Sequence, residues 1–377
     1  MGVYTYWIVV AIVIVLGLIM PQRGEQKKYY IIIVTAVQTF VCAFRYMYLT
    51  GDLRKYAATY YELPAYNWFD KNVWQEGRNA GYAWLMKVTS QISNGNFQVF
   101  LILLAVFTQV ALAILIYKYS PKPWLSYVVW NCMAFYITYD FTSIKQGLAM
   151  AILMFAMNFI MDEKPIKFLI TTLIAGFIHV PALCFLPAYF LMKRRVSNKT
   201  VLFYIFATII IWTFRGPIVD AVTEMYYAGN EELEFIANTN NVLGGRFFVV
   251  CLILLAGIML KGFREKRFEG LFNIILVAAI FQMFAIYDNV FTRLADYYLQ
   301  FSVLFIPMIF YNSFREEEIN RNAATPMLPF NERSMRILVM ALTVVLIWWY
   351  YQTCIGVTIT NPVDDYTNFR FMWDVIQ

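Results

Sequence analysis

Long apolar stretches alternate with short polar segments along most of the chain, and many of the polar segments are rich in Lys and Arg. A helix needs about 20 mostly apolar residues to cross about 30 Å of hydrocarbon. By that criterion the pattern predicts membrane-spanning helices. We place them at residues 3–20, 29–47, 97–117, 125–142, 144–161, 166–179, 180–192, 200–218, 246–262, 270–288, 292–311 and 335–354. The first stretch lacks a basic start and a clear small-residue cleavage site, so we interpret it as a span rather than a signal peptide.

Residues 166–192 do not fit one full span or two. They are too long for a single crossing, too short for a pair, and contain Pro181 and Pro187. Broken or half-depth helices are tolerated in a membrane only where protein or a wet cavity surrounds them. We therefore expect two short segments here, over 166–179 and 180–192.

Three connecting segments are long enough to have a character of their own. Residues 48–96 are polar and aromatic, and Ala80–Ile92 has the pattern of a re-entrant or interfacial helix. Residues 219–245 are acidic and indicate an outer surface loop or lid, whereas 312–334 have mixed charge and indicate a cytoplasmic loop. We expect one integral membrane domain over 1–377.

Composition agrees with this interpretation. The 377 residues are 61% hydrophobic and 14% charged, against roughly 25% charged in ordinary soluble domains. A soluble globule of this length has too little interior for that much apolar surface. The predicted fold class is an all-α, polytopic transmembrane bundle of about 12 spans.

Basic residues set the expected orientation. One face of the predicted topology collects 19 of the 30 Lys and Arg residues, and the acids favour the other face. The positive-inside rule assigns the basic face to the cytoplasm and both termini to the outside. The basic set is Arg23, Lys27, Lys28, Lys118, Lys122, Lys164, Lys167, Lys193, Arg194, Arg195, Lys199, Lys261, Arg264, Lys266, Arg267, Arg315, Arg321, Arg333 and Arg336.

Several chemistries lack their usual residues. His179 is the only histidine, and the five cysteines stand apart from one another, so the sequence predicts no metal site and no cofactor. Phosphate-binding glycine loops and serine-hydrolase signatures are missing as well. We expect no nucleic-acid partner, because the net charge of +6 is divided between two membrane faces.

Charged residues at the predicted outer ends of the helices are the main functional signal. Ionisable groups at such depth cost several kcal/mol unless they are paired or hydrated, and a group of guanidinium ions suits a phosphate-bearing ligand. On the outer face a lipid-linked phosphate or pyrophosphate is the natural candidate. Snorkelling to the interface is the alternative for each cation taken singly. The cations are Arg45, Lys145, Arg215, Arg246 and Arg293, beside Asp140, Asp288 and Asp296.

Other candidates have two interpretations each. His179 ends a short segment and is either a general base or a hydrogen-bonded residue at a broken helix. Asp52 and Arg54 either shape an outer cavity or form a weak exposed ion pair. The aromatic side chains of 56–84 are either an interfacial belt or a surface for sugar rings. Asp364 and Asp365 are a very weak metal signal.

Short motifs in a fixed order resemble a known family. The stretches are FRYMYLTGDLRKY (44–56), GYAWL (81–85), SIKQGLAMAI (143–152), IAGFIHVPAL (174–183) and TRLADYYLQF (292–301). Their order, the span layout and the single His resemble EpsG-like, Wzy-type polysaccharide polymerases of O-antigen, capsule or exopolysaccharide. One position departs from the family pattern, because Lys145-Gln146 stands where Arg-Gln is frequent. Lys keeps the charge but loses the bidentate fork of Arg.

The resemblance implies a fold, a reaction and a location. Such proteins are GT-C-type glycosyltransferases of the bacterial inner (plasma) membrane with an active site facing the periplasm or exterior. They transfer a growing glycan from undecaprenyl pyrophosphate to a lipid-linked repeat unit, with inversion and without a metal. Expected partners are the lipid-linked oligosaccharide, the bilayer, and a chain-length regulator and flippase of the same pathway.

The reaction assigns roles to the candidate residues. An acceptor hydroxyl needs a base, for which we expect His179 first and Asp52 or Asp140 behind it. A departing diphosphate needs cations around it, and we expect Tyr297 and Gln146 to form hydrogen bonds with sugar or phosphate. The expected cations are Arg45, Arg54, Lys145, Arg246 and Arg293.

Two other functions remain open on the sequence. A lipid-linked oligosaccharide flippase predicts cations along a path through both halves of the membrane, whereas here they gather near one face. A membrane O-acyltransferase of surface glycans predicts polar groups that reach inward past mid-depth.

Overall fold

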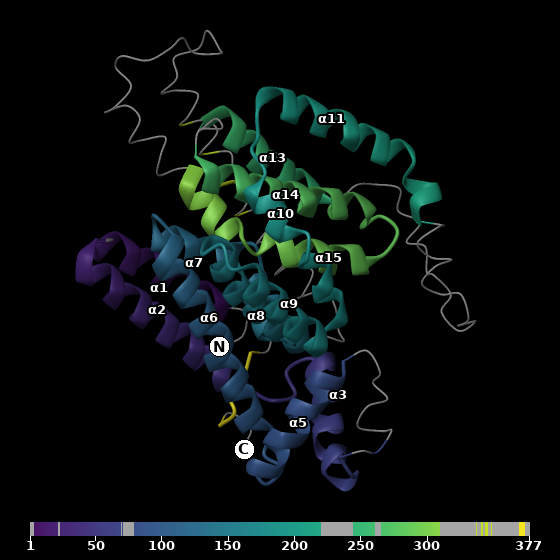
Figure 1. The fold of residues 1–377 in the computed structure, drawn as a ribbon. Helices are drawn as coiled ribbons and strands as arrows, with labels where there is room; N and C mark the ends of the chain where they lie inside the picture. The colour runs from purple at the N-terminus through teal and green to yellow at the C-terminus, as the bar shows by residue number, and fades with distance from the viewer. Residues whose placement is uncertain are drawn as a thin grey trace.

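The computed structural model describes residues 4–21, 23–68, 70, 79–219, 244–260, 265–309, 337, 341, 344, 345, 348 and 369–373. These residues form helices and no strand; one isolated antiparallel bridge joins Arg45 to Phe371. The all-helical class predicted from the sequence is therefore confirmed over the described residues (Figure 1).

The helices follow the apolar stretches closely. In chain order they are α1 (Tyr4–Ile19), α2 (Gly24–Ala43), α3 (Gly51–Glu62), η1 (Leu63–Ala65), α5 (Ala80–Ile92), α6 (Phe97–Tyr119), α7 (Pro123–Cys132), η2 (Tyr136–Asp140), α8 (Ile144–Met161), α9 (Pro165–Ile178), η3 (Val180–Phe185), α10 (Ala188–Lys193), α11 (Asn198–Thr213), α13 (Gly245–Leu260), α14 (Lys266–Phe284) and α15 (Asn289–Leu299).

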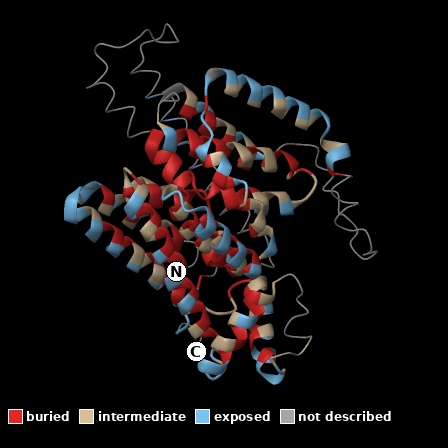
Figure 2. Ribbon diagram, in the orientation of Figure 1, coloured by how far each residue is buried: buried red, intermediate tan, exposed pale blue. Residues whose placement is uncertain are grey.

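Three of the described helices, α6, α8 and α14, are long and apolar enough to cross a membrane alone, and shorter apolar helices accompany them. Large apolar side chains are exposed in helical stripes. On α9 the stripe is Ile166, Leu169, Ile170, Leu173, Ile174 and Phe177. The spacing of three and four residues marks one helix face, and Figure 2 shows similar exposure along α11. Such faces suit contact with lipid, and the chain is a membrane protein.

The polar segments that the sequence assigns to one membrane face lie together at one end of the fold. Lys27 donates to the Tyr117 carbonyl at 2.9 Å, and Arg267 lies over the Tyr119 ring at 5.5 Å. Lys266 pairs with Glu163 at 3.2 Å. The hydrogen bond from that ammonium holds the pKa of the Glu163 carboxyl below its ordinary value. Four basic segments therefore meet, as one membrane face requires.

A hairpin formed by α9, η3 and α10 begins and ends at that same end. Glu163, two residues before α9, contacts Lys266, and Arg195, just after α10, contacts Glu269 at 3.3 Å. At 1.5 Å per α-helical and 2.0 Å per 3₁₀ residue, each arm is about 21 Å long. That is short of the ~30 Å hydrocarbon thickness. The hairpin therefore has the half-depth form that the sequence predicts for 166–192.

Proline explains where the hairpin turns. Pro181 has no backbone N–H and restricts the residue before it, so α9 cannot continue past it. His179 is accordingly extended, with φ −148° and ψ 105°. The arms pack closely, because an added Cβ at Gly176 would come within 2.3 Å of the Leu183 side chain. His179 therefore sits at the turn.

Two predicted spans are wrong as single helices. Residues 125–142 divide into α7 and the π-helical turn η2, because Ala134 takes the left-handed conformation with φ 61°. Residues 292–311 divide after α15, and a further helix covers 302–309. Each break lies close to one polar residue, Asn131 or Gln300, within an otherwise apolar stretch. The mean hydropathy of the stretch therefore does not reveal the break.

The pair α3 and α5 lies at one end of the molecule (Figure 1). The α5 helix has the bounds Ala80–Ile92 that the sequence favours. Lys87, buried on α5, donates to the Leu63 and Tyr66 carbonyls at 2.7 and 2.5 Å. An added Cβ on Gly81 would lie 2.4 Å from the Phe177 ring. These contacts hold the pair together and press α5 against the hairpin.

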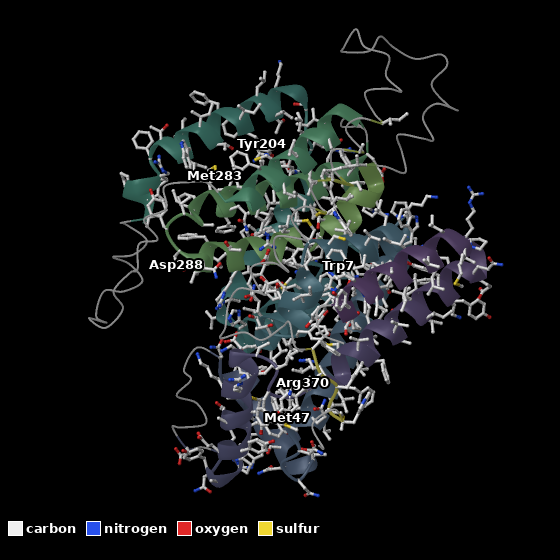
Figure 3. The ribbon with its side chains drawn as sticks, turned by 180° about the vertical axis from the view of Figure 1, so that it is seen from behind. Trp7, Met47, Tyr204, Met283, Asp288 and Arg370 are labelled. Atoms are coloured by element: carbon white, nitrogen blue, oxygen red, sulfur yellow. The ribbon has the colours of Figure 1, made fainter. Side chains whose placement is uncertain are left out.

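The described C-terminal residues pack beside the end of α2. Tyr46 N–H donates to the Arg370 carbonyl at 2.8 Å, and Met372 N–H donates to the Phe44 carbonyl at 2.9 Å. Figure 3 shows Arg370 and Met47 in the same region. Phe369 also lies 5.9 Å from Tyr6 between ring centroids. The first helix and the last described segment are therefore neighbours.

Several sequence predictions fall outside the described residues. They concern nearly all of the acidic loop 219–245, the loop 312–334, most of the span 335–354 and the pair Asp364 and Asp365.

Candidate functional site

His179 forms a hydrogen bond with a buried phenol. Its Nδ1 meets the hydroxyl of Tyr297, which lies on α15 with 0% exposure. The imidazole itself is only partly buried. The turn of the hairpin therefore carries an imidazole whose Nδ1 is hydrogen-bonded to Tyr297. We name His179, Tyr297, Lys145, Arg293 and Gln146 the His179 group.

Lys145 joins this group from the first turn of α8. Its ammonium lies 5.9 Å from the ring centroids of both Tyr56 and Tyr82. These tyrosines belong to α3 and α5 and contact each other at 5.5 Å between centroids. The positive charges of Lys145 and Arg293 both act on the His179 ring. Two cations therefore lie near the only histidine.

Gln146 ties α8 to α15. Its Nε2 donates to the backbone carbonyl of Arg293 at 2.9 Å, and its side chain is 3% exposed. The next residue, Gly147, packs directly on the turn η2, since an added Cβ would lie 2.3 Å from the Tyr139 carbonyl oxygen. Glycine is required here because the two nearest atoms opposite belong to the backbone, which cannot rotate away as a side chain can. The start of α8 is thus fixed from two sides.

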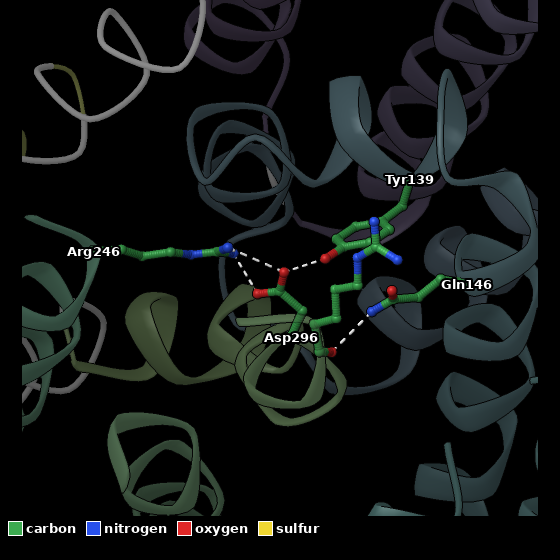
Figure 4. A network of polar contacts seen from close by, with 5 residues as sticks. Tyr139, Gln146, Arg246 and Asp296 are labelled. Carbon is green, nitrogen blue, oxygen red and sulfur yellow. Dashed lines mark hydrogen bonds and ion pairs between the residues drawn. The ribbon is translucent and has the colours of Figure 1, made fainter. Parts of the chain in front are cut away.

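A second cluster, the Asp296 group, lies beside the first. Asp296 is 1% exposed and binds Arg246 through both carboxylate oxygens, and it accepts a hydrogen bond from the Tyr139 hydroxyl. Figure 4 shows these three side chains and Gln146 meeting between α8, α13, α15 and η2. A bidentate Arg pair satisfies a buried carboxylate well. Asp296 precedes Tyr297, so this cluster anchors the part of α15 that holds the phenol.

A third cluster surrounds Asp140. Its carboxylate accepts from Gln109 Nε2 at 2.6 Å and Trp130 Nε1 at 3.2 Å, and the charge of Arg45 acts on it. Arg45 is 1% exposed, lies 5.3 Å from the Phe141 centroid and donates to the Cys42 carbonyl. We name these residues the Asp140 group. Tyr139 and Asp140 are adjacent, so the turn η2 serves both the second and the third cluster.

The remaining candidates lie elsewhere or at the margin. Asp52 is in the first turn of α3, and its carboxylate is 3.5 Å from the Ser143 hydroxyl that precedes α8. Arg54 is exposed and donates to the Tyr48 carbonyl at 3.2 Å. Arg215 lies over the Trp212 ring at 4.1 Å. Asp288 caps α15 through the Val290 N–H. Among the described contacts, those of Arg54, Arg215 and Asp288 do not reach His179.

The structure therefore divides the residues that the sequence gathers around one diphosphate. Lys145, Arg293, Gln146 and Tyr297 accompany His179, whereas Arg246 and Arg45 serve the two carboxylate clusters. Tyr139, which binds Asp296, was not among the site residues predicted from the sequence. The adjacent Tyr-Asp at 139–140, just before a tight turn, was its only signal.

These features define a class: a polytopic helical membrane protein whose candidate site lies where a half-depth hairpin meets the ends of other helices. The chain belongs to the EpsG family, which it matches over residues 28–357. The resemblance noted in the sequence is thereby confirmed, and every candidate site residue falls inside that range. No curated protein and no solved structure matches the chain. Family membership supports a role like that of polysaccharide polymerases, which are glycosyltransferase-like enzymes.

Proposed function

We propose that this protein is a Wzy-type polysaccharide polymerase. It transfers a growing glycan from undecaprenyl pyrophosphate to a lipid-linked repeat unit, on the outer face of the bacterial inner membrane. The observation that carries the proposal is the His179 group: an imidazole at the turn of a half-depth hairpin, hydrogen-bonded to Tyr297, with Lys145 and Arg293 near it. About 12 spans and a GT-C-like architecture complete the proposal, with EpsG family membership as support.

The reaction is one displacement. The acceptor hydroxyl oxygen attacks the anomeric carbon, the bond from that carbon to the diphosphate oxygen breaks, and its electron pair leaves with the diphosphate. The hydroxyl proton passes to His179, and the sugar configuration inverts. A positioned base of this kind contributes about 10²–10⁴ in rate. Lys145 and Arg293 offset the charge that develops on the departing diphosphate, so the displacement needs no metal.

Tyr297 determines which imidazole nitrogen is free. A neutral imidazole has one N–H and one acceptor nitrogen. If Nδ1–H donates to the Tyr297 oxygen, Nε2 keeps its lone pair and accepts the proton from the acceptor hydroxyl. We propose this tautomer, in which Tyr297 orients the base as a carboxylate does in other catalytic histidines.

The other predicted residues have lesser roles in this proposal. Asp52 is the second candidate base, because its contact with Ser143 brings it to the start of α8. Asp140 and Arg45 support the helices around the site through buried hydrogen bonds, and Arg246 does so through its ion pair with Asp296. Arg54 is exposed and would meet ligand only outside the hairpin.

Purified protein provides the test. We expect polymer on gels when the protein is incubated with lipid-linked repeat unit, with EDTA present. Lys145→Ala and Arg293→Ala should abolish it, whereas Lys55→Ala, which removes an exposed cation from α3, should not. If both site variants form polymer with the same length distribution as the wild type, the two cations have no role in the mechanism. Arg45→Ala tests the sequence-based assignment separately: normal protein levels without polymer would restore Arg45 to the site.

Cells that lack the gene separate this function from the other two. Loss of a polymerase leaves single repeat units on the outer leaflet. Loss of a flippase leaves them on the inner leaflet, and loss of an O-acyltransferase gives full-length polymer without acyl groups. Either of the latter outcomes would overturn the proposal. Interaction with a chain-length regulator or flippase is a further expectation of the polymerase assignment.

A further inference from the structure

The amide of Gln146 has a fixed orientation and one unused atom. Its Nε2 donates to the Arg293 carbonyl at 2.9 Å. A carbonyl oxygen only accepts, so the amide nitrogen must face it and the amide oxygen must face away. Among the described residues none donates to that Oε1, although the atom is buried.

An amide oxygen in this state is unfavourable in the free protein. A buried acceptor without a donor costs about 1–3 kcal/mol, and such atoms are few in native structures. Gln98 and Gln300 have the same pattern: their Nε2 atoms donate to the Ala43 and Tyr297 carbonyls at 2.6 and 3.0 Å, and their Oε1 atoms have no described donor. Gln146 differs from both because its neighbour Lys145 and its carbonyl partner Arg293 are cations that act on His179.

The chemistry of Oε1 selects its ligand. A diphosphate at neutral pH offers only acceptor oxygens, so it has no hydrogen to give to Oε1. A sugar hydroxyl or an acetamido N–H does donate. We infer that Gln146 Oε1 accepts a hydrogen bond from the sugar attached to the diphosphate, which makes Gln146 a specificity-determining residue. This inference rests on the proposed function.

Adjacent residues at the start of α8 then have separate tasks. Lys145 supplies charge for the diphosphate, and Gln146 reads a polar group of the first sugar. Figure 4 shows Gln146 extending from α8 toward α15 beside Tyr139. Lys145 provides a cation for the diphosphate, and Gln146 provides a hydrogen-bond acceptor for the sugar. Because the two residues are adjacent, they suit a ligand in which a sugar and a diphosphate are directly joined.

Two ligands distinguish these tasks in a binding experiment on the purified full chain. Geranylgeranyl diphosphate carries the diphosphate and no sugar, and lipid-linked repeat unit extracted from polymerase-deficient cells carries both. Gln146→Leu should weaken binding of the repeat unit about tenfold or more, the loss expected for one buried hydrogen bond and its unsatisfied partner. Its affinity for geranylgeranyl diphosphate should stay within about twofold. Lys145→Gln should weaken the binding of both ligands.

The matched control is Gln98→Leu, which removes the same kind of amide away from the His179 group and should change neither affinity. Gln146→Met replaces Gln146→Leu if the latter fails to fold. Equal losses for both ligands would show a phosphate contact or a packing role and would overturn the inference, as would unchanged affinity for both. Wild-type protein that binds neither ligand would instead reject the proposed function.

Discussion

The Tyr297 hydroxyl is one atom whose removal tests the proposed base. Tyr297→Phe keeps the buried ring and removes the group that orients His179. We expect polymer formation to fall at least ~10-fold, part of the ~10²–10⁴ that a positioned base contributes. The measurement is the initial rate of polymerisation by purified protein.

Tyr298→Phe is the matched control. Tyr298 is adjacent, 1% exposed, and donates to the Cys184 carbonyl rather than to the histidine. Both variants lose one buried hydrogen bond, so their thermal stabilities should be similar. A wild-type rate for Tyr297→Phe, or equal losses in the two variants, would mean that the phenol has only a structural role.

Asp296 is a residue whose effect should appear in stability. Asp296→Asn removes the charge that Arg246 binds, in a pair whose side chains are 1% and 14% exposed. Breaking a buried pair costs about 3–5 kcal/mol, whereas exposed pairs contribute about 0–1 kcal/mol. We expect the melting temperature in detergent to fall clearly for Asp296→Asn and hardly at all for Lys266→Gln, whose pair with Glu163 is exposed. Equal shifts would contradict this.

The role of an individual residue was predictable from the sequence only where its residue type is rare in the chain. A single histidine beside a broken segment indicates a special role, and the structure places it against Tyr297. Which cation accompanies it was not predictable. Arg246 and Arg293 are both charges near outer helix ends, yet one binds Asp296 and the other acts on His179. That difference depends on how α13 and α15 pack, which the residue pattern does not specify.

At the scale of elements, the start of α8 depends on Gly147. Gly147→Ala would place a Cβ 2.3 Å from the Tyr139 carbonyl oxygen, and backbone cannot swing aside as a side chain can. We expect η2 and α8 to separate, which displaces Lys145 and Gln146 and abolishes polymer formation. Gly216→Ala is the control, since an added Cβ there meets nothing within 4 Å. An active Gly147→Ala variant would show that the junction tolerates movement.

Helix boundaries were easier to predict where the residue pattern or a proline permits only one boundary. The range Ala80–Ile92 and the division of 166–192 at Pro181 follow from pattern and from the missing proline N–H. The π-helical turn at Tyr136–Asp140 was not predictable, because its residues continue an apolar run. Its cause is tertiary: Tyr139 and Asp140 each bind partners on other helices.

At the scale of the whole molecule, the hairpin reconciles the charge pattern with the fold. If 166–192 crossed the membrane once, Arg194 and Arg195 would emerge opposite Lys164. The contacts of Glu163 and Arg195 with α14 instead return both ends to the same side. The basic segments then share one end of the molecule, and His179 lies at the turn of the hairpin, away from its two basic ends. A polymerase that acts outside the cytoplasm needs this arrangement.

Single cysteines introduced into a variant without its native cysteines test that topology. In spheroplasts, an impermeant maleimide should label Lys55→Cys and Tyr61→Cys, which lie exposed on α3. Lys164→Cys and Arg194→Cys, at the two ends of the hairpin, should label only after the membrane is opened, as should the control Lys28→Cys, exposed near the start of α2. Labelling of Lys164→Cys and Arg194→Cys from opposite sides would replace the hairpin by a full crossing. If all five variants label from the side opposite to the one expected, the hairpin is kept but the His179 group is on the cytoplasmic side. A polymerase of exported glycans has no substrate there.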